Sequence, residues 1–378
     1  MRGFSKRTGW DTSESAFAGA IREARAAGRD VCDLTVSNPT VCGFDYDVEG
    51  ILGALGDPGS MVYDADPRGM RSAREAVCGY YRDHGAEVGV DQVLMTTSTS
   101  EAYGFLFRLL CDAGDEVLVA SPGYPLFDFL ADLEDVRLRT YPLFHDYGWW
   151  IDFGELERRI GPRTKAVLVV HPANPTGHWT SAAERTRLEE MCARYGLALI
   201  VDEVFLDYPV GEAEDSFAVG QAECLTFVLS GLSKVAGLPQ MKVGWVVTLG
   251  PMAAREEALR RLEVIADTFL SMGAPAQRAL PMWMARRAAI QGQIRGRVQE
   301  NLGVLAGSGL GYLPVAAGWS GVLLLPGKLG GAEEIFAELG VVVHPGSFYG
   351  LEGAGRVVVS LIGGAEEFRR GVGLLGRA

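Results

Sequence analysis

The sequence places three polar residues, Asn174, Asp202 and Lys234, shortly after runs of apolar residues that are typical of buried strands. In an open α/β sheet, the carboxyl ends of parallel strands share one edge, and ligands bind in the crevice there. One site therefore receives an amide, a carboxylate and an amine. A lysine buried in such a site favours its neutral amine, which can attack a carbonyl group and form a Schiff base.

Each of these residues has an ordinary explanation when it is taken alone. Lysine is common in surface loops after strands, and Asn174 stands in an Asn-Pro sequence that is typical of turns. Asp202 is harder to explain in this way, because a carboxylate after the apolar residues 198–201 is costly to bury without a partner. The three residues together favour a shared chemical role.

A fourth feature is a predicted anion site. Residues 93–97 indicate a strand, and residues 100–110 indicate the helix that follows it. Ser98, Thr99 and Ser100 lie where this helix begins, so that backbone N–H groups, hydroxyl groups and the positive end of the helix dipole converge on an anion. Simple helix capping by hydroxyl residues is the alternative explanation. In combination with the lysine, the aspartate and the asparagine, the pattern favours a bound phosphate group.

These features are the groups that pyridoxal phosphate requires: a lysine for its aldehyde, a carboxylate for its ring nitrogen, a donor for its phenolic oxygen and a cradle for its phosphate. On these residues the chain resembles the fold-type I, class I/II aminotransferase family. The resemblance implies an α/β fold, with a mostly parallel sheet in a large cofactor-binding domain and a smaller α+β domain. The segments that carry it follow the family's order over nearly the whole chain, and they are residues 63–81, 96–125, 171–177, 201–205, 230–245 and 344–361.

The domain organisation follows from the pattern of apolar segments. Between residues 45 and 260, short apolar runs alternate with helical patterns at a spacing typical of βαβ units, and we assign 45–260 to the large domain. Residues 261–378 begin with a long helical stretch and, with residues 1–44, are expected to form the small domain. The predicted strands are 93–97, 116–120, 166–170, 198–202 and 225–229 in the large domain, and 321–326, 341–345 and 356–362 in the small one.

The resemblance implies a role for each cofactor-binding residue. Lys234 forms the Schiff base and then acts as the base that moves a proton, Asp202 pairs with the ring nitrogen, and Asn174 bonds the phenolic oxygen. The ring of Tyr124 stacks on the cofactor. The phosphate is held by Ser98, Thr99 and Ser100, by Ser230 or Ser233, by Lys242, and by Tyr63 of a neighbouring subunit, which implies a homodimer with shared active sites.

The chain departs from the family pattern at two cofactor positions. Lys242 stands where an arginine is usual, and lysine keeps the charge but loses the bidentate fork. Phe205 stands where a tyrosine hydroxyl commonly bonds the phenolic oxygen, so that bond is missing or replaced. Tyr208 follows three residues later, but the sequence does not show that its side chain reaches the same place.

The substrate side of the site is implied by three further residues. Arg356 matches the arginine that binds the substrate α-carboxylate, a role suited to a planar and permanently charged group. It implies an amino acid and a 2-oxo acid as substrates. Ser37 lies in a segment that resembles the substrate-side loop, and Trp10 is a second candidate that would otherwise be a packed aromatic residue.

The predicted function is therefore a pyridoxal phosphate-dependent aminotransferase that moves an amino group between an amino acid and a 2-oxo acid. Another pyridoxal phosphate reaction on the same scaffold, such as β- or γ-elimination, cyclisation or oxidation, stays open, because the fold and the cofactor do not fix the reaction type. A ligand-sensing regulator would need an attached DNA-binding module, for which the two lobes leave no room in 378 residues.

Composition and charge agree with this reading. The chain is 48% hydrophobic and carries a formal net charge of -13, which argues against unspecific binding to nucleic acid or anionic membranes. The first residues lack the apolar segment of a signal peptide, no run reaches the length of a membrane span, and we expect a cytoplasmic protein. Its six cysteines form no CxxC pair and its histidines form no cluster, so we expect no metal site.

Overall fold

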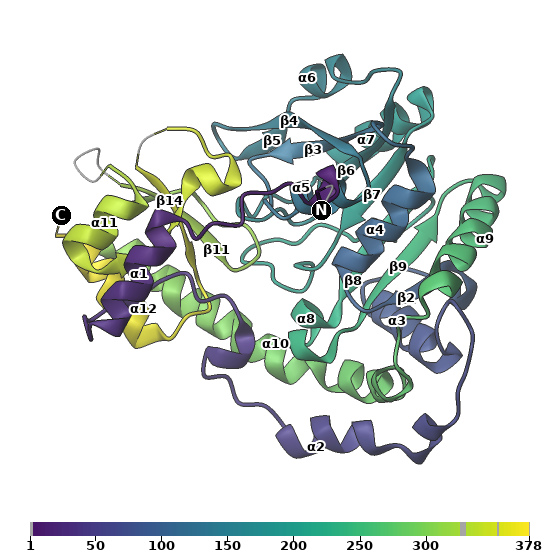
Figure 1. The fold of residues 1–378 in the computed structure, drawn as a ribbon, viewed down its shortest axis with the longest axis horizontal. Coiled ribbons are helices and arrows are strands. Elements are labelled where there is room, and N and C mark those ends of the chain that lie inside the picture. The colour runs from purple at the N-terminus through teal and green to yellow at the C-terminus, as the bar shows by residue number, and fades with distance from the viewer. Residues whose placement is uncertain (1–2, 326–329, 354, 378) are drawn as a thin grey trace.

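The computed structural model describes residues 3–325, 330–353 and 355–377, and its largest sheet has eight strands. Figure 1 shows how the elements are arranged. The strand order is β2-β9-β8-β7-β6-β3-β4-β5. The neighbours from β8 to β4 pair in parallel, whereas β9 is antiparallel to β2 and β8, and β5 is antiparallel to β4. The expected α/β fold with a mostly parallel sheet is confirmed. The strands are β2 Val93–Thr96, β3 Glu116–Ser121, β4 Arg137–His145, β5 Trp149–Ile151, β6 Thr164–Val170, β7 Ala198–Asp202, β8 Thr226–Gly231 and β9 Gly244–Leu249.

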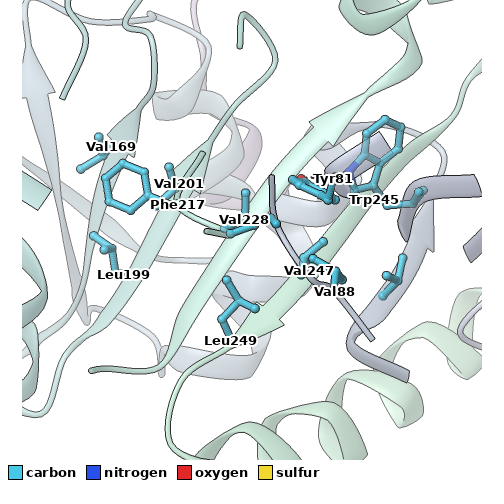
Figure 2. Packing of buried hydrophobic residues seen from close by; sticks show 14 of the residues in the cluster. Tyr81, Val88, Val169, Leu199, Val201, Phe217, Val228, Trp245, Val247 and Leu249 are labelled. Carbon is cyan, nitrogen blue, oxygen red and sulfur yellow. Dashed lines mark hydrogen bonds between the residues drawn. The ribbon is translucent and has the colours of Figure 1, made fainter. Parts of the chain in front are cut away.

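Both faces of this sheet are buried, which explains why its central strands are apolar throughout. In β7, Leu199 and Val201 point into one core, while Ala198 and Ile200 point into the other. Figure 2 shows part of the first core, in which Leu199 and Val201 lie near Phe217. The first core is covered by α3 Arg71–Asp83, α6 Phe153–Arg158 and α7 Ala182–Tyr195, and the second by α4 Thr99–Leu110, α5 Phe127–Leu133 and α9 Met252–Phe269.

A second body is built on a four-stranded antiparallel sheet with the order β10-β11-β14-β13. Its core is a separate hydrophobic cluster. A parallel pair, β1 with β12, ties the N-terminal segment to this part of the chain. The strands are β1 Cys32–Asp33, β10 Gly311–Tyr312, β11 Ser320–Leu324, β12 Val341–Val342, β13 His344–Pro345 and β14 Arg356–Ser360, and the helices are α1 Ala16–Ala26, α11 Ala332–Leu339 and α12 Ala365–Leu375.

The long helix α10, Ala274–Ser308, connects the two bodies. Its first half buries Leu280 and Trp283 in the core of the large sheet, and its second half buries Ile294 and Leu305 in the core of the small sheet. The remaining short helices are α2 Val48–Gly53, α8 Leu232–Val235 and the 3-10 turns Lys6–Thr8, Pro39–Val41, Ala54–Gly56, Pro58–Met61, Val90–Gln92, Pro239–Met241 and Gly346–Tyr349.

The predicted strands agree with the observed ones to within about two residues, except that 341–345 divides into β12 and β13. The long helical stretch after residue 260 is the end of α9 followed by α10. The division at 260 stays a proposal, because α9 crosses it and packs on the large sheet. Pro326, at the end of a predicted strand, and Ala354, in the last family motif, lie outside the described residues. None of the described helices has an apolar stretch long enough to span a membrane.

Candidate active site

A cavity of about 320 Å³ lies between the two sheets, at the carboxyl ends of β6, β7 and β8. Residues from both bodies line it, as expected for a ligand site at this edge of an α/β sheet. Many of the residues predicted from the sequence come together here. They are Ser37, Ser98, Thr99, Ser100, Tyr124, Asn174, Asp202, Ser233, Lys234 and Lys242.

Asp202 ends β7 and is held by two hydrogen bonds. The hydroxyl group of Tyr103, on α4, donates to one carboxylate oxygen over 2.8 Å, and the backbone N–H of Val204 donates to the other over 3.1 Å. Burial raises the pKa of Asp202, while these two bonds and the charge of Lys234 act in the opposite direction. The carboxylate is therefore fixed in position, and a cation bound in the cavity would stabilise its charge.

Lys234 lies in the single turn α8, directly after β8. Lys234 lines the cavity, and burial lowers the pKa of its amine, while the charge of Asp202 acts in the opposite direction. The Nζ atom lies 5.1 Å from the ring centre of Trp319 and 5.9 Å from that of Phe205. Burial and the aromatic surroundings favour the neutral form of the Lys234 amine.

The backbone of Lys234 is anchored by Tyr208, whose hydroxyl group donates to the Lys234 carbonyl oxygen over 2.6 Å. Tyr208 is buried and packs on Trp319, with 5.1 Å between ring centres. It does not line the cavity, so it does not replace the hydroxyl group that Phe205 lacks. The aromatic group of Phe205, Tyr208 and Trp319 instead positions the lysine.

The predicted anion site lies where α4 begins. Ser98 caps the helix, because its hydroxyl oxygen accepts a hydrogen bond from the Glu101 N–H over 3.1 Å. Gly244 opens β9 beside it, and a Cβ atom there would lie 2.8 Å from the carbonyl carbon of Ser98. Glycine thus keeps open the cradle in which Thr99 and the exposed Lys242 also lie. Backbone N–H groups and a cation at a helix N-terminus suit a phosphate.

Asn174 connects the two bodies. Its side-chain oxygen accepts a hydrogen bond from the Ser320 hydroxyl group on β11, over 3.1 Å. The amide nitrogen of Asn174 is then the group left to donate to a ligand. Tyr124 also lines the cavity and packs edge-on against Phe127.

Four predicted residues do not line the cavity. Ser230 is fully buried and donates to the Glu203 carbonyl oxygen, so Ser233 is the member of that pair that reaches the site. Trp10 donates from its indole to Asp132 over 2.7 Å. The side chains of Tyr63 and Arg356 are exposed. Their predicted roles remain predictions, and only Tyr63 was expected to act on another subunit.

Other lining residues were not predicted from the sequence. In the large body they include Tyr103, and from the small sheet and its connections they include Thr35, Trp319, Ser320, His344, Tyr349, Val358 and Ser360. Burial lowers the pKa of His344, which makes this imidazole neutral at pH 7. The sequence carries only a weak signal for them, because a tryptophan before a short strand has many possible neighbours.

Fold and site together define a fold-type I enzyme of the pyridoxal phosphate class, with a lysine, a carboxylate and an anion cradle on one cavity. The chain belongs to the family "Aminotransferase class I and II", whose model matches residues 57–369. Members of this family use pyridoxal phosphate. The Gly244 cradle, the Asn174 amide and the Asp202 carboxylate fit this cofactor.

Similar proteins include glutamate-pyruvate aminotransferase AlaA of Escherichia coli, 28% identical over 255 residues, which are 67% of this chain and 63% of that protein. Alanine aminotransferase of Mycobacterium tuberculosis is 30% identical over 274 residues, covering 70% of this chain and 63% of the relative. The match thus spans somewhat less than two thirds of these relatives. Among solved structures, alanine aminotransferase from Pyrococcus furiosus has a TM-score of 0.88, with 22% identity and 99% of both chains covered. This last likeness shows the fold.

Proposed function

We propose that this protein is a pyridoxal phosphate-dependent aminotransferase that moves an amino group between an amino acid and a 2-oxo acid. The observation that carries the proposal is the position of Lys234 and Asp202 on one enclosed cavity, close enough for the charge of Asp202 to affect the pKa of Lys234. The family and the alanine and glutamate-pyruvate aminotransferases among the relatives support it.

The cofactor, when bound, supplies an aldehyde that takes up amino groups and a ring that withdraws electrons from the neighbouring carbon. Asp202, held by Tyr103 and by the Val204 N–H, would keep a positive charge on the ring nitrogen. The Asn174 amide would donate to the phenolic oxygen, and the start of α4 with Lys242 would hold the phosphate. The neutral amine of Lys234 would take a proton from the substrate Cα, because burial lowers its pKa.

We also propose that the active form is a homodimer in which Tyr63 of one copy reaches the phosphate site of the other. In support, consecutive residues of this segment expose large apolar side chains: Met61 is 89%, Val62 63% and Tyr63 75% exposed. Light scattering measures the mass. Co-expression of Lys234→Ala with Tyr63→Ala tests the shared site, since only a mixed dimer combines an intact Lys234 with an intact Tyr63. A fully active monomer would refute this arrangement.

The cytoplasm is the compartment that we propose for this protein. All six cysteines are free thiols, which agrees with a reducing compartment. Fractionation of the source cells, followed by detection of the protein in the soluble and membrane fractions, tests the proposal.

The reaction type is tested by mixing the cofactor-loaded protein with each common amino acid in the absence of a 2-oxo acid. Mass spectrometry of the cofactor and the products is the measurement. Stoichiometric pyridoxamine phosphate and a 2-oxo acid would support transamination and name the donor. Ammonia, or an eliminated, cyclised or oxidised product with the cofactor regenerated, would favour the alternative reactions. The departures from the family pattern at Phe205 and Lys242 are compatible with these reactions.

A further inference from the structure

The small sheet forms one wall of the cavity, and the side chains on this wall are hydroxyl groups, apolar groups and one imidazole. Ser320 on β11 and Ser360 on β14 are cross-strand partners, and both line the cavity. Val358 lines it next to Ser360. His344, on β13, pairs with Val358 in the ladder and adds an imidazole to the same wall.

Positive charge is confined to the other side. Among the described residues that line the cavity, the only lysines are Lys234 and Lys242, and none is an arginine. Both lysines belong to the large body, where the proposed function assigns them to the cofactor. A substrate group that faces the wall of Ser320 and Ser360 meets neutral donors and acceptors.

Arg356 does not add a positive charge to this wall. Alternation along β14 puts Arg356 on the same face as Val358 and Ser360, but four residues before Ser360 and thus roughly 13 Å away along the strand. Its ladder partner is Leu324, at the far end of the pair. The side chain is exposed, and its Nε atom lies beside Gly353 instead of the cavity.

We propose that this wall binds the carboxyl end of the amino donor through neutral hydrogen bonds, so that the enzyme accepts amino acid amides and esters at rates within tenfold of those of the free amino acids, or faster. The inference rests on the proposed function. An enclosed carboxylate needs a cation or several donors to offset its lost hydration, and an arginine fork is the usual solution. A carboxamide needs only donors and acceptors, which serine hydroxyl groups and a neutral imidazole provide.

The test uses the holoenzyme and matched pairs: each common L-amino acid, its amide and its methyl ester. The cofactor absorbance gives the second-order rate of the half-reaction for each compound. We expect the best amide to react within tenfold of its free acid, or faster. If every reactive free acid reacts more than tenfold faster than its amide, the inference is overturned while the proposed function stays in place. If no acid, amide or ester converts the cofactor, the proposed function falls, and the inference falls with it.

Two variants locate the recognition. In Ser360→Ala, we expect kcat/KM for the amide and the acid to fall together by three- to tenfold, with KM carrying the change. In Arg356→Ala, we expect the ratio of acid to amide rates to stay within twofold of the parent enzyme. A selective loss of the free acids in Arg356→Ala would show that Arg356 folds over the substrate, and this would overturn the inference. A strong preference for acids that survives this substitution would overturn it as well, and would point to a cation from a second copy of the chain.

Discussion

Tyr208 donates a hydrogen bond to the backbone carbonyl oxygen of Lys234 over 2.6 Å, and so the residue that is expected to do the chemistry is fixed through its main chain. Tyr208 is buried against Trp319, whose ring lies 5.1 Å from the lysine Nζ. One aromatic pair therefore restrains both ends of Lys234. Tyr208 therefore positions Lys234, although Tyr208 itself does not line the cavity.

The Tyr208→Phe variant tests that role. It removes one of the hydrogen bonds to the Lys234 carbonyl oxygen, which still accepts from the Gly237 N–H over 3.3 Å. The loss costs about 0.5–1.5 kcal/mol of unfolding free energy, and it loosens α8. We expect kcat to fall about five- to thirtyfold and the pH midpoint of the cofactor absorbance band to move. Tyr46→Phe is the matched control, because Tyr46 donates to the Gly237 carbonyl oxygen over 2.8 Å. Equal changes of the pH midpoint in both variants would contradict a specific role for Tyr208.

The residues of the large sheet could be predicted from the sequence because their positions depend on local order. Asn174 and Lys234 each follow a strand and Asp202 ends one, and parallel neighbours bring these strand ends together. The wall of Ser320 and Ser360 depends instead on how α10 places a second sheet over the first. Strand alternation predicts that Arg356 lies on the face of β14 that lines the cavity. Its position at the start of the strand, four residues before Ser360, places it outside the cavity.

Tyr103 is the second residue for which we predict a defined loss. Its hydroxyl group donates to Asp202, and this bond lowers the pKa of the carboxylate against the effect of burial. In Tyr103→Phe, the carboxylate keeps only the Val204 N–H, and it holds a cationic ring nitrogen less well. Because a hydrogen bond to a charged group contributes about 1.5–3 kcal/mol, we expect pyridoxal phosphate to bind roughly tenfold or more weakly.

A cofactor titration followed by tryptophan fluorescence measures this loss. Tyr81→Phe serves as the control, since Tyr81 is another buried tyrosine but contacts Trp245 instead of Asp202. If both variants lose the same affinity, general loosening of the core explains the effect and the Tyr103 bond has no special role.

The charge of Asp202 should be visible in the titration of Lys234 in the cofactor-free protein. Burial lowers the pKa of Lys234 from its ordinary 10.5, and Asp202 opposes this effect. In Asp202→Asn the opposing charge is gone, so we expect the pKa of Lys234 to fall further. The rate of labelling with an amine reagent as a function of pH, read by mass spectrometry, gives the midpoint. Lys165 is the internal reference, and a midpoint for Lys234 that rises in the variant would contradict the assignment.

Glu203, next to Asp202, gives a prediction about stability instead of catalysis. It is fully buried, accepts hydrogen bonds from the Phe217 N–H and the Ser216 hydroxyl group, and burial raises its pKa from 4.5 to about 7. Because the folded state holds this proton more tightly than the unfolded state, the stabilisation is fully present below pH 4.5 and is lost as the pH rises through about 7. In Glu203→Gln this pH dependence is absent. We expect the unfolding free energy of the parent protein, relative to the variant, to fall by about 2 kcal/mol between pH 5 and pH 8. Urea denaturation of both proteins at the two pH values measures the difference, and a difference that grows with pH would mean that Glu203 is charged throughout in the folded protein.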